Sequence, residues 1–349
     1  MYTILCIMTC HHFLKKNEWI TNVLGLREHK VRSNPLVSVE LTELRKKGIA
    51  AMITHLRLKA YGKINLALDV LGKRDNGYHD VRMIMQTVGL HDRIELYRTK
   101  EPGIRLETNL FYLPNNEQNL AYRAAALLME EFGVKEGVSI KLKKFIPVSA
   151  GMAGGSTDAA AVLVGVNRMF DLGFTKKELM ERGVKLGADV PYCIMRGTAL
   201  SEGIGEILTE LPAPPQCHLV IAKPQISVST KAVYGKLRVN ELAPEEHPDI
   251  DGMTEAIRNG DLDGVISRLG NVLETVTIPD HPEIARIKSM MMENGACGSL
   301  MSGSGPTVFG IYKDKELAEK ACQALREADD GRLTRQVYLT EFYNRKKAR

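Results

Sequence analysis

The sequence lacks the features that mark membrane, secreted and metal-binding scaffolds. None of its apolar runs reaches 18 residues, so no transmembrane helix is expected. The apolar first ten residues lack the basic leader and cleavage site of a signal peptide. The six cysteines are scattered, at positions 6, 10, 193, 217, 297 and 322, and no His/Cys set stands at zinc spacing. We therefore expect a cytoplasmic protein with reduced, buried thiols.

A strong charge of one sign is also missing from most of the chain. The net charge is +5, but residues 1–54 hold eight Lys/Arg against four Asp/Glu, while residues 55–349 hold 39 against 38. The body has no long basic stripe and no aromatic-basic pattern. Neither nucleic-acid binding nor membrane association is therefore expected.

The composition that is present is that of a globular protein, with 349 residues, 44% of them apolar and 26% charged. This length suggests two domains of normal size. Residues 1–54 differ from the rest, since they hold the single tryptophan, Trp19, and show weak periodicity. We interpret 1–54 as an N-terminal extension, either disordered or produced by a mis-assigned start. The Pro-rich stretch 211–216 separates two domains, 55–212 and 213–349.

Strand and helix patterns alternate in both domains. Alternation over Ile64–Val70 predicts a strand, the turn residues at 74–78 follow, and a second strand is expected near 81–97. Helices are predicted near 116–133, 158–170 and 175–187, with a strand at 138–147 and a strand-and-loop segment from 188 to the linker. The second half predicts strands near 217–224, 298–312 and 334–342, and helices near 229–239, 252–259, 262–276, 282–294 and 314–328. The pattern indicates a mixed α+β protein.

The clearest chemical signal is the glycine-rich stretch PVSAGMAGGSTDAAAVL, at 147–163, which runs into a buried helix. A helix N-terminus attracts anions, and glycine lets the backbone approach a phosphate closely. Ser156 and Thr157 can add hydroxyl donors. The stretch matches neither the Walker A motif nor G-x-G-x-x-G. A tight turn before a helix is the alternative, but one glycine or serine would suffice for that.

Four other stretches carry weaker signals, each with a structural alternative. Lys63 and Asn65 share one face of their strand, although a strand lysine is usually only solvated. Asp189 stands in LGADVPY, where Pro191 is expected to keep Val190 out of helical geometry. An aspartate in such a turn is more often a turn residue than a catalyst. The stretch DNGYHD is compatible with a plain hairpin turn. The stretch MSGSGPTVF is compatible with either a hairpin or a second loop that caps a phosphate.

The combination and order of these stretches are more specific than any one of them. The chain resembles the GHMP kinase superfamily, named for galactokinase, homoserine kinase, mevalonate kinase and phosphomevalonate kinase. The resemblance rests on AYGKINLALD, PVSAGMAGGST and MSGSGPTVF, and within the superfamily it narrows through RDNGYHDV, LGADVPY and GIGEIL. It covers about residues 55–345.

The resemblance implies a two-domain fold, with a ribosomal-protein-like N-terminal ATP-binding domain and a ferredoxin-like C-terminal domain. It implies transfer of the ATP γ-phosphoryl group to the 2-hydroxyl of a cytidine diphosphate-linked methylerythritol, in isoprenoid precursor synthesis by the non-mevalonate route. Mg²⁺ is expected with ATP, without an assigned protein ligand. The small-molecule substrate would be the main partner of a monomer or weak homodimer.

The resemblance also assigns roles to individual residues. It makes Lys63 and Asp189 the catalytic pair. ATP would be bound by Asn119 and by the loop residues Pro147, Val148, Ser149, Ala150, Gly151, Met152, Ala153, Gly154, Gly155, Ser156 and Thr157. The substrate would be bound by Asn65, Tyr78, His79, Thr230 and Tyr234, and the second glycine loop would consist of Gly303, Ser304 and Gly305.

Two departures and two alternatives accompany the resemblance. Members usually have Ala-Pro-Ala-Lys where this chain has Ala-Tyr-Gly-Lys, at 60–63, and they lack the extension. Another kinase of the superfamily, of the mevalonate or homoserine type, is one alternative, although an aromatic residue at 234 and the Gly-Tyr-His run favour a cytidine substrate. A non-catalytic ligand sensor is the other, but such a protein would be expected to lack the lysine or the aspartate.

Overall fold

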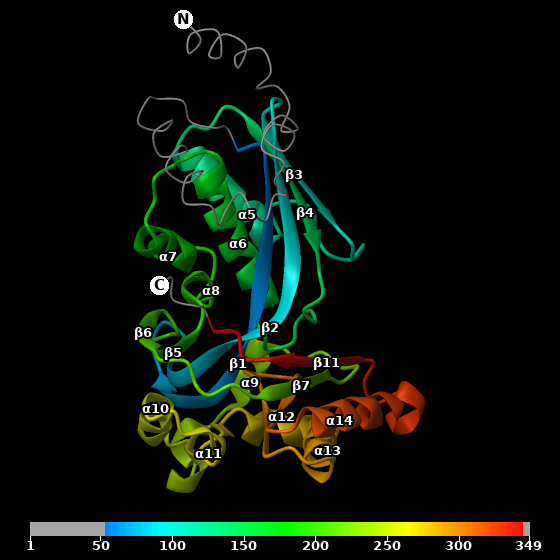
Figure 1. The fold of residues 1–349 in the computed structure, drawn as a ribbon. Helices are drawn as coiled ribbons and strands as arrows, with labels where there is room; N and C mark the ends of the chain where they lie inside the picture. The colour runs from blue at the N-terminus through cyan, green and yellow to red at the C-terminus, as the bar shows by residue number, and fades with distance from the viewer. Residues whose placement is uncertain (1–52, 345–349) are drawn as a thin grey trace, which may run out of the picture. The chain divides into compact units, whose positions relative to one another are not determined.

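The long antiparallel hairpin of β1 (His55–Lys73) and β2 (His79–Thr99) runs through the molecule from the helices α5 and α6 toward the second half of the chain (Figure 1). The computed structural model describes residues 53–344, so the expected N-terminal extension lies outside the described residues apart from 53 and 54. The register of the hairpin shifts between Tyr61 and Lys63 and again between Asn65 and Ala67. Bulges of this kind re-aim side chains, and both flank candidate site residues.

The hairpin is the centre of a seven-stranded sheet. Its order is β3 (Gly103–Thr108), β4 (Gly137–Lys143), β2, β1 and β8 (Gly270–Asn271), while β5 (Thr198–Glu202) pairs with β2 and β6 (Ile207–Leu211) pairs with β5. The helices α5 (Leu120–Glu131) and α6 (Gly154–Met169) pack side by side and against this sheet, followed by α7 (Lys176–Val184) and α8 (Val190–Met195). The helix α6 is buried nearly all round, and its Ala159, Ala160 and Ala161 allow this close packing.

The second half holds a four-stranded sheet of order β11-β7-β10-β9, with every neighbouring pair antiparallel. Its strands are β7 (His218–Lys223), β9 (Gly298–Met301), β10 (Val308–Tyr312) and β11 (Gln336–Glu341). If the four strands are numbered by their order in the chain, they lie across the sheet as fourth, first, third and second. Helices follow the first and the third strands, and this is the ferredoxin-like arrangement. The helices are α9 (Thr230–Lys236), α10 (Ile250–Arg258), α11 (Leu262–Ile266), α12 (Glu274–Asp280), α13 (Pro282–Glu293) and α14 (Lys315–Glu327). The expected ferredoxin-like C-terminal half is confirmed.

The two halves are joined through the first sheet. The strand β8, from the second half, pairs in parallel with β1 through Ala67–Gly270 and Leu68–Asn271. Phe342, just after β11, is 2% exposed and bridges to Val88 on β2. These contacts fix the helices and loops of the second half against the strand that carries Lys63.

Three sequence predictions about individual elements are wrong. The segment after Asp189 forms the helix α8, because Pro191 lies in its first turn, where the missing N–H costs no hydrogen bond. The predicted helix 262–276 is two helices, because α11 ends at Ile266 and β8 comes before α12 begins at Glu274. The helix α6 begins at Gly154, a turn before the predicted start, although Gly-Gly-Ser-Thr has low helix propensity.

The cysteines follow the prediction only in part. Cys193, Cys217 and Cys322 are free and buried, whereas Cys297 is free and exposed because it lies outside β9 at the end of the preceding turn. No helix between residues 53 and 344 combines the length and the apolar character that crossing a membrane would require.

Candidate active site

Lys63 is a buried lysine for which residues 53–344 supply no carboxylate partner. The residue is 5% exposed, and its Nζ donates to Asn65 Oδ1 at 2.7 Å, the only partner of its side chain within residues 53–344. Asn65 is fully buried and donates in turn to the sulfur of Met83. A buried ammonium with one neutral partner is costly to maintain, and such residues cluster at functional sites.

Asp189 is a carboxylate that the described residues leave without a hydrogen bond or ion pair. It occupies the N-cap position of α8 and is half-buried, but its side chain does not cap the helix. Cys193, one turn further along, donates its N–H to the Asp189 carbonyl at 3.0 Å. Burial raises the pKa of the Cys193 thiol, the charge of Asp189 raises it further, and the charge of Lys63 lowers it. Lys63 and Asp189 therefore lie within electrostatic range of one buried thiol.

The glycine-rich loop at 147–153 leads directly into α6. Ser149, Gly151 and Ala153 all have positive φ, of 50°, 71° and 55°. The Ala153 carbonyl accepts the N–H of Thr157 at 2.9 Å, which leaves the first N–H groups of α6 facing the loop. Of the two hydroxyl residues at the start of α6, Thr157 donates its Oγ1 hydrogen to the carbonyl of Tyr61 on β1 at 2.7 Å. The Ser156 hydroxyl has no hydrogen bond among the described residues.

The second glycine loop packs directly on the first. Ser302 Oγ donates to the Gly151 carbonyl at 3.1 Å. A Cβ added at Gly151 would lie 2.0 Å from the Ser302 carbonyl oxygen, and one added at Gly303 would lie 3.5 Å from Asn65 Oδ1. Gly305 has φ 82°, a conformation that favours glycine. The structure thus brings the two loops and the Lys63–Asn65 pair into one contact region.

Two residues that the sequence interpretation missed hold the second loop in place. Asn271 Nδ2 donates to the carbonyls of Met301 and Gly303, at 2.9 and 2.8 Å, and its Oδ1 accepts the N–H of Leu273 at 3.0 Å. Glu274 Oε1 accepts the N–H of Met301 at 2.8 Å. The Gly-Asn pair inside a predicted helix is the sequence signal that could have revealed the break in this helix.

Aromatic side chains from both halves meet at the far end of the β1–β2 hairpin. The rings of His79 and Tyr234 lie 5.2 Å apart at an angle of 48°, whereas Tyr78 stays 58% exposed. Burial, and then the charge of Lys73, lowers the pKa of His79 below its ordinary value, which keeps the ring neutral at neutral pH. Burial and the charge of Asp189 raise the pKa of Tyr234, which places Tyr234 and Asp189 in one neighbourhood.

Thr230 and Asn119 make specific contacts of their own. Thr230 Oγ1 lies 2.8 Å from the hydroxyl oxygen of Ser304, so α9 is connected to the second glycine loop. Asn119 is the N-cap of α5, with its Oδ1 accepting from Ala121 N at 2.9 Å and its Nδ2 donating to Pro114 O at 2.9 Å. Asn119 therefore shapes its loop, and its side chain is already engaged with the backbone on both sides.

Tyr61 stands where related sequences were expected to have proline. Its ring stacks on Tyr343 at 3.9 Å, and the Arg196 guanidinium lies 5.4 Å from the ring centre. Burial, followed by the hydrogen bond to Tyr343, raises the pKa of Tyr61 to about 12. The tyrosine at this position removes no candidate catalytic group, since Lys63 follows two residues later. The Tyr61 carbonyl accepts the hydrogen bond from Thr157.

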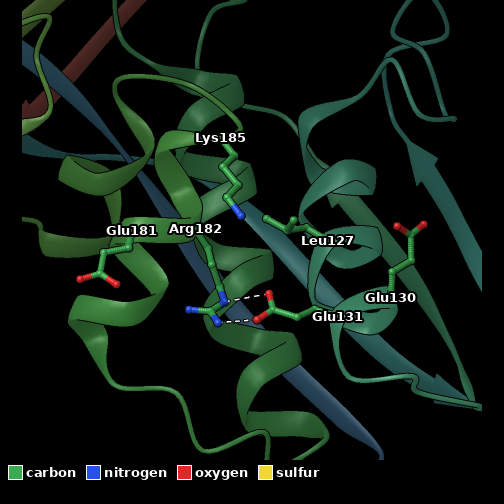
Figure 2. A pocket seen from close by; sticks show the side chains of 6 residues that line it. All are labelled: Leu127, Glu130, Glu131, Glu181, Arg182 and Lys185. Atoms are coloured by element: carbon green, nitrogen blue, oxygen red, sulfur yellow. Dashed lines mark hydrogen bonds and ion pairs between the residues drawn. The ribbon is translucent and has the colours of Figure 1, made fainter.

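A surface pocket of about 450 Å³ lies between α5 and α7 (Figure 2). It is lined by Leu127, Glu130, Glu131, Glu181, Arg182 and Lys185. The guanidinium of Arg182 makes two hydrogen bonds to the Glu131 carboxylate across it, one of them 2.9 Å long. Its lining includes none of the candidate site residues, and the paired charges satisfy each other.

Between residues 53 and 344, no group of three His, Cys, Asp or Glu side chains converges as a metal site would require.

Comparison with known proteins identifies relatives over most of the chain. The model of the GHMP kinases N terminal domain matches residues 119–197, and that of the GHMP kinases C terminal domain matches residues 253–330. A 4-diphosphocytidyl-2-C-methyl-D-erythritol kinase of Lachnospira eligens is 56% identical over 288 residues, covering 82% of this chain and 98% of its own. The protein of the same name from Caldicellulosiruptor bescii is 50% identical over 271 residues, covering 78% and 94%.

Solved structures agree with these relatives. A crystal structure of 4-(cytidine 5'-diphospho)-2C-methyl-D-erythritol kinase has a TM-score of 0.70 at 31% identity, covering 83% of this chain and all of its own. A homoserine kinase from Cytophaga hutchinsonii has a TM-score of 0.69 at 19% identity, covering 84% and 96%. The second similarity shows the shared fold alone.

Proposed function

Because the chain belongs to the 4-diphosphocytidyl-2-C-methyl-D-erythritol kinase family of GHMP kinases, we propose that it transfers the γ-phosphoryl group of ATP to the 2-hydroxyl of 4-diphosphocytidyl-2-C-methyl-D-erythritol. The products are the 2-phosphate and ADP, in isoprenoid precursor synthesis by the methylerythritol phosphate route. The observation that supports this most strongly is that Lys63 and Asp189, neither of which has an ion-pair partner among the described residues, lie within electrostatic range of the same Cys193 thiol. The backbone of Lys63 also donates to Met152 O of the first glycine loop at 3.2 Å. Residues 55–212 would form the ATP-binding domain and 213–349 the second domain, in the cytoplasm, where thiols stay reduced.

ATP is held by the first glycine loop. The free N–H groups at the start of α6 and the positive end of its dipole face the loop residues 147–153, where they stabilise phosphate charge. The hydroxyl of Ser156 is the side-chain donor available there. The hydrogen bond from the Ser302 hydroxyl to the Gly151 carbonyl fixes this loop against the second glycine loop.

Mg²⁺ would be supplied with the nucleotide and, when bound, would neutralise charge on the transferred phosphoryl group. The residues present fit this ion, because Mg²⁺ keeps several waters and phosphate oxygens and needs only one or two protein oxygens. The Ser156 hydroxyl and the Asp189 carboxylate are oxygen groups without other partners among the described residues.

Phosphoryl transfer requires positioning and charge stabilisation more than covalent chemistry. Asp189 orients the acceptor hydroxyl and accepts its proton as the new P–O bond forms. Lys63, kept in place by Asn65, stabilises negative charge on the reacting oxygens. In a loose transition state the hydroxyl loses its proton late, so orientation of the hydroxyl by Asp189 matters more than the basicity of the carboxylate.

The cytidine end of the acceptor is recognised by the aromatic residues. Tyr234 and Tyr78 stack on the base, and the neutral ring of His79 both donates to and accepts from the polar edge of cytosine. Tyr78 is 58% exposed, so its ring is accessible to an incoming base. Thr230 and Asn65 supply polar contacts nearer the reacting hydroxyl.

The stacking contact predicts a selective effect on the acceptor. Tyr234→Ala should raise the KM for the cytidylyl substrate by about 5- to 150-fold, since a base–aromatic stack is worth about 1–3 kcal/mol, and should leave the KM for ATP unchanged. Steady-state kinetics with each substrate varied in turn measures both constants. Tyr234→Phe is the matched control, because it keeps the ring. An unchanged acceptor KM in Tyr234→Ala would remove Tyr234 from the site.

The acceptor itself is tested by a panel assay. Purified protein with ATP and Mg²⁺ should release ADP rapidly with 4-diphosphocytidyl-2-C-methyl-D-erythritol and only at background rate with mevalonate or homoserine. Faster turnover of mevalonate or homoserine would assign the chain to another activity of the same fold.

A further inference from the structure

A buried cluster of three charged residues lies beneath the first glycine loop. Lys144 Nζ donates to Asp158 Oδ2 at 2.6 Å and also to Asp92 Oδ2. The three side chains are no more than 5% exposed. None of the three is among the residues assigned to the site above, and their elements are different: β2 for Asp92, the residue after β4 for Lys144, and α6 for Asp158.

The cluster connects the two ends of the loop. Before the loop, Asp92 Oδ1 accepts the N–H groups of Phe145 and Ile146, at 2.5 and 2.8 Å. After it, Asp158 belongs to the second turn of α6. A Cβ added at Gly154, the first residue of α6, would lie only 3.3 Å from Lys144 Nζ. The ammonium therefore packs against the helix start that faces the loop, and its two carboxylate partners fix the chain on both sides.

The charges of the cluster suit a site for an anion. Asp158 Oδ1 is buried and has no hydrogen-bond partner, and burial together with the neighbouring Asp92 raises its pKa well above the ordinary value, against the pull of Lys144. Burial lowers the pKa of Lys144, but the two carboxylates outweigh it and the net shift is upward. Both shifts favour less negative charge in the cluster, which suits a position next to the loop that holds the phosphates.

We propose that Lys144 is a positioning residue for ATP, which acts through Asp92 and Asp158 to hold residues 147–153 in the shape that binds the phosphates. This rests on the proposed use of ATP but not on the identity of the acceptor. Stability alone does not require such a cluster, since apolar replacements of buried ion pairs are often neutral or stabilising. The contacts to both ends of one loop give the cluster its specific role.

The test uses the full chain and measures ATP binding directly. Lys144→Met leaves Asp92 buried without its partner and could unfold the protein, so the principal variant is Lys144→Met/Asp92→Asn. There the amide oxygen still accepts from Phe145 and Ile146, one positive and one negative charge are removed together, and burial, which raises the pKa of Asp158, favours the uncharged form of that side chain. Lys143→Met, which removes an exposed neighbouring lysine, is the matched control. Isothermal titration with ATP and Mg²⁺ gives Kd, kinetics gives both KM values, and thermal unfolding without ATP gives Tm.

We expect the double variant to weaken ATP binding by about 10- to 100-fold, as displacement of a positioning group does, and to leave the acceptor KM and the affinity of Lys143→Met unchanged. A folded double variant with the wild-type Kd for ATP overturns the proposal, whatever its Tm, because a purely structural cluster would change only Tm. If the wild type binds ATP but does not phosphorylate the cytidylyl alcohol, the proposed acceptor fails and this proposal stands. A wild type that binds no ATP overturns both.

Discussion

Asp189→Asn should lower kcat by about 10²–10⁴-fold, which is the usual contribution of a positioned acid–base group. The amide keeps the shape of the carboxylate but cannot take the proton of the acceptor hydroxyl. Stability should be little affected, because the Asp189 side chain does not cap α8 and has no partner among residues 53–344. Binding of ATP should persist, since the loop at 147–157 is untouched. Steady-state kinetics and ATP titration measure these effects separately.

Controls distinguish this role from a general effect of a helix N-cap. Asp314 is the N-cap of α14 and does accept from Leu317 N, at 3.0 Å. Asn caps a helix about as well as Asp, so Asp314→Asn should leave both stability and turnover nearly unchanged. Lys63→Met should also lower kcat, and the double variant with Asp189→Asn should be little worse than the worse single variant, because residues that act as one unit are non-additive. Near-normal turnover of Asp189→Asn beside a strongly impaired Lys63→Met would reduce Asp189 to a structural residue.

Gly151→Ala should lower kcat/KM for ATP by about 100-fold or more. The residue has φ 71°, and an added Cβ would lie 2.0 Å from the backbone oxygen of Ser302. That oxygen is backbone and cannot swing aside, so the two glycine loops must separate. Misplacement of reacting groups by about 1 Å costs about 10²-fold. Kinetics with ATP varied measures the loss.

Gly173→Ala is the matched control for the strain at Gly151. Gly173 has a similar φ of 80°, but nothing lies within 4 Å of the added Cβ. It should lose about 1–2 kcal/mol of stability, the cost of a left-handed backbone for alanine, with normal kinetics in the folded protein. If both variants show the same kinetics, the contact between the loops has no part in ATP use.

The sequence identified those parts of the site that depend on local pattern. Alternation placed Lys63 and Asn65 on one strand face, and the structure joins them at 2.7 Å. The glycine run predicted a helix N-terminus, although the helix begins a turn earlier, because Ala153 takes the left-handed conformation that a residue-by-residue propensity does not foresee. The alternating elements also indicated two mixed α/β halves, and these are present.

Contacts between distant segments could not be found in this way. Nothing in GNVLE signals that Asn271 supports the loop at 301–303, because those partners are set by the parallel pairing of β8 with β1. The cluster of Lys144, Asp92 and Asp158 is likewise invisible, since each residue alone resembles a solvated surface charge. The proline rule failed at Pro191 because a helix start tolerates the residue that a helix interior excludes.

The position of the new phosphate tests the central proposal most directly. Phosphorus NMR of the product formed from 4-diphosphocytidyl-2-C-methyl-D-erythritol and ATP reports which hydroxyl has reacted. Carbon 2 carries the methyl group and no hydrogen, so a phosphate on its oxygen should give a monoester signal without coupling to a carbinol proton, formed in equal amount with ADP. A monoester signal split by carbinol protons, or ADP formed without any new phosphomonoester, would contradict the proposed reaction.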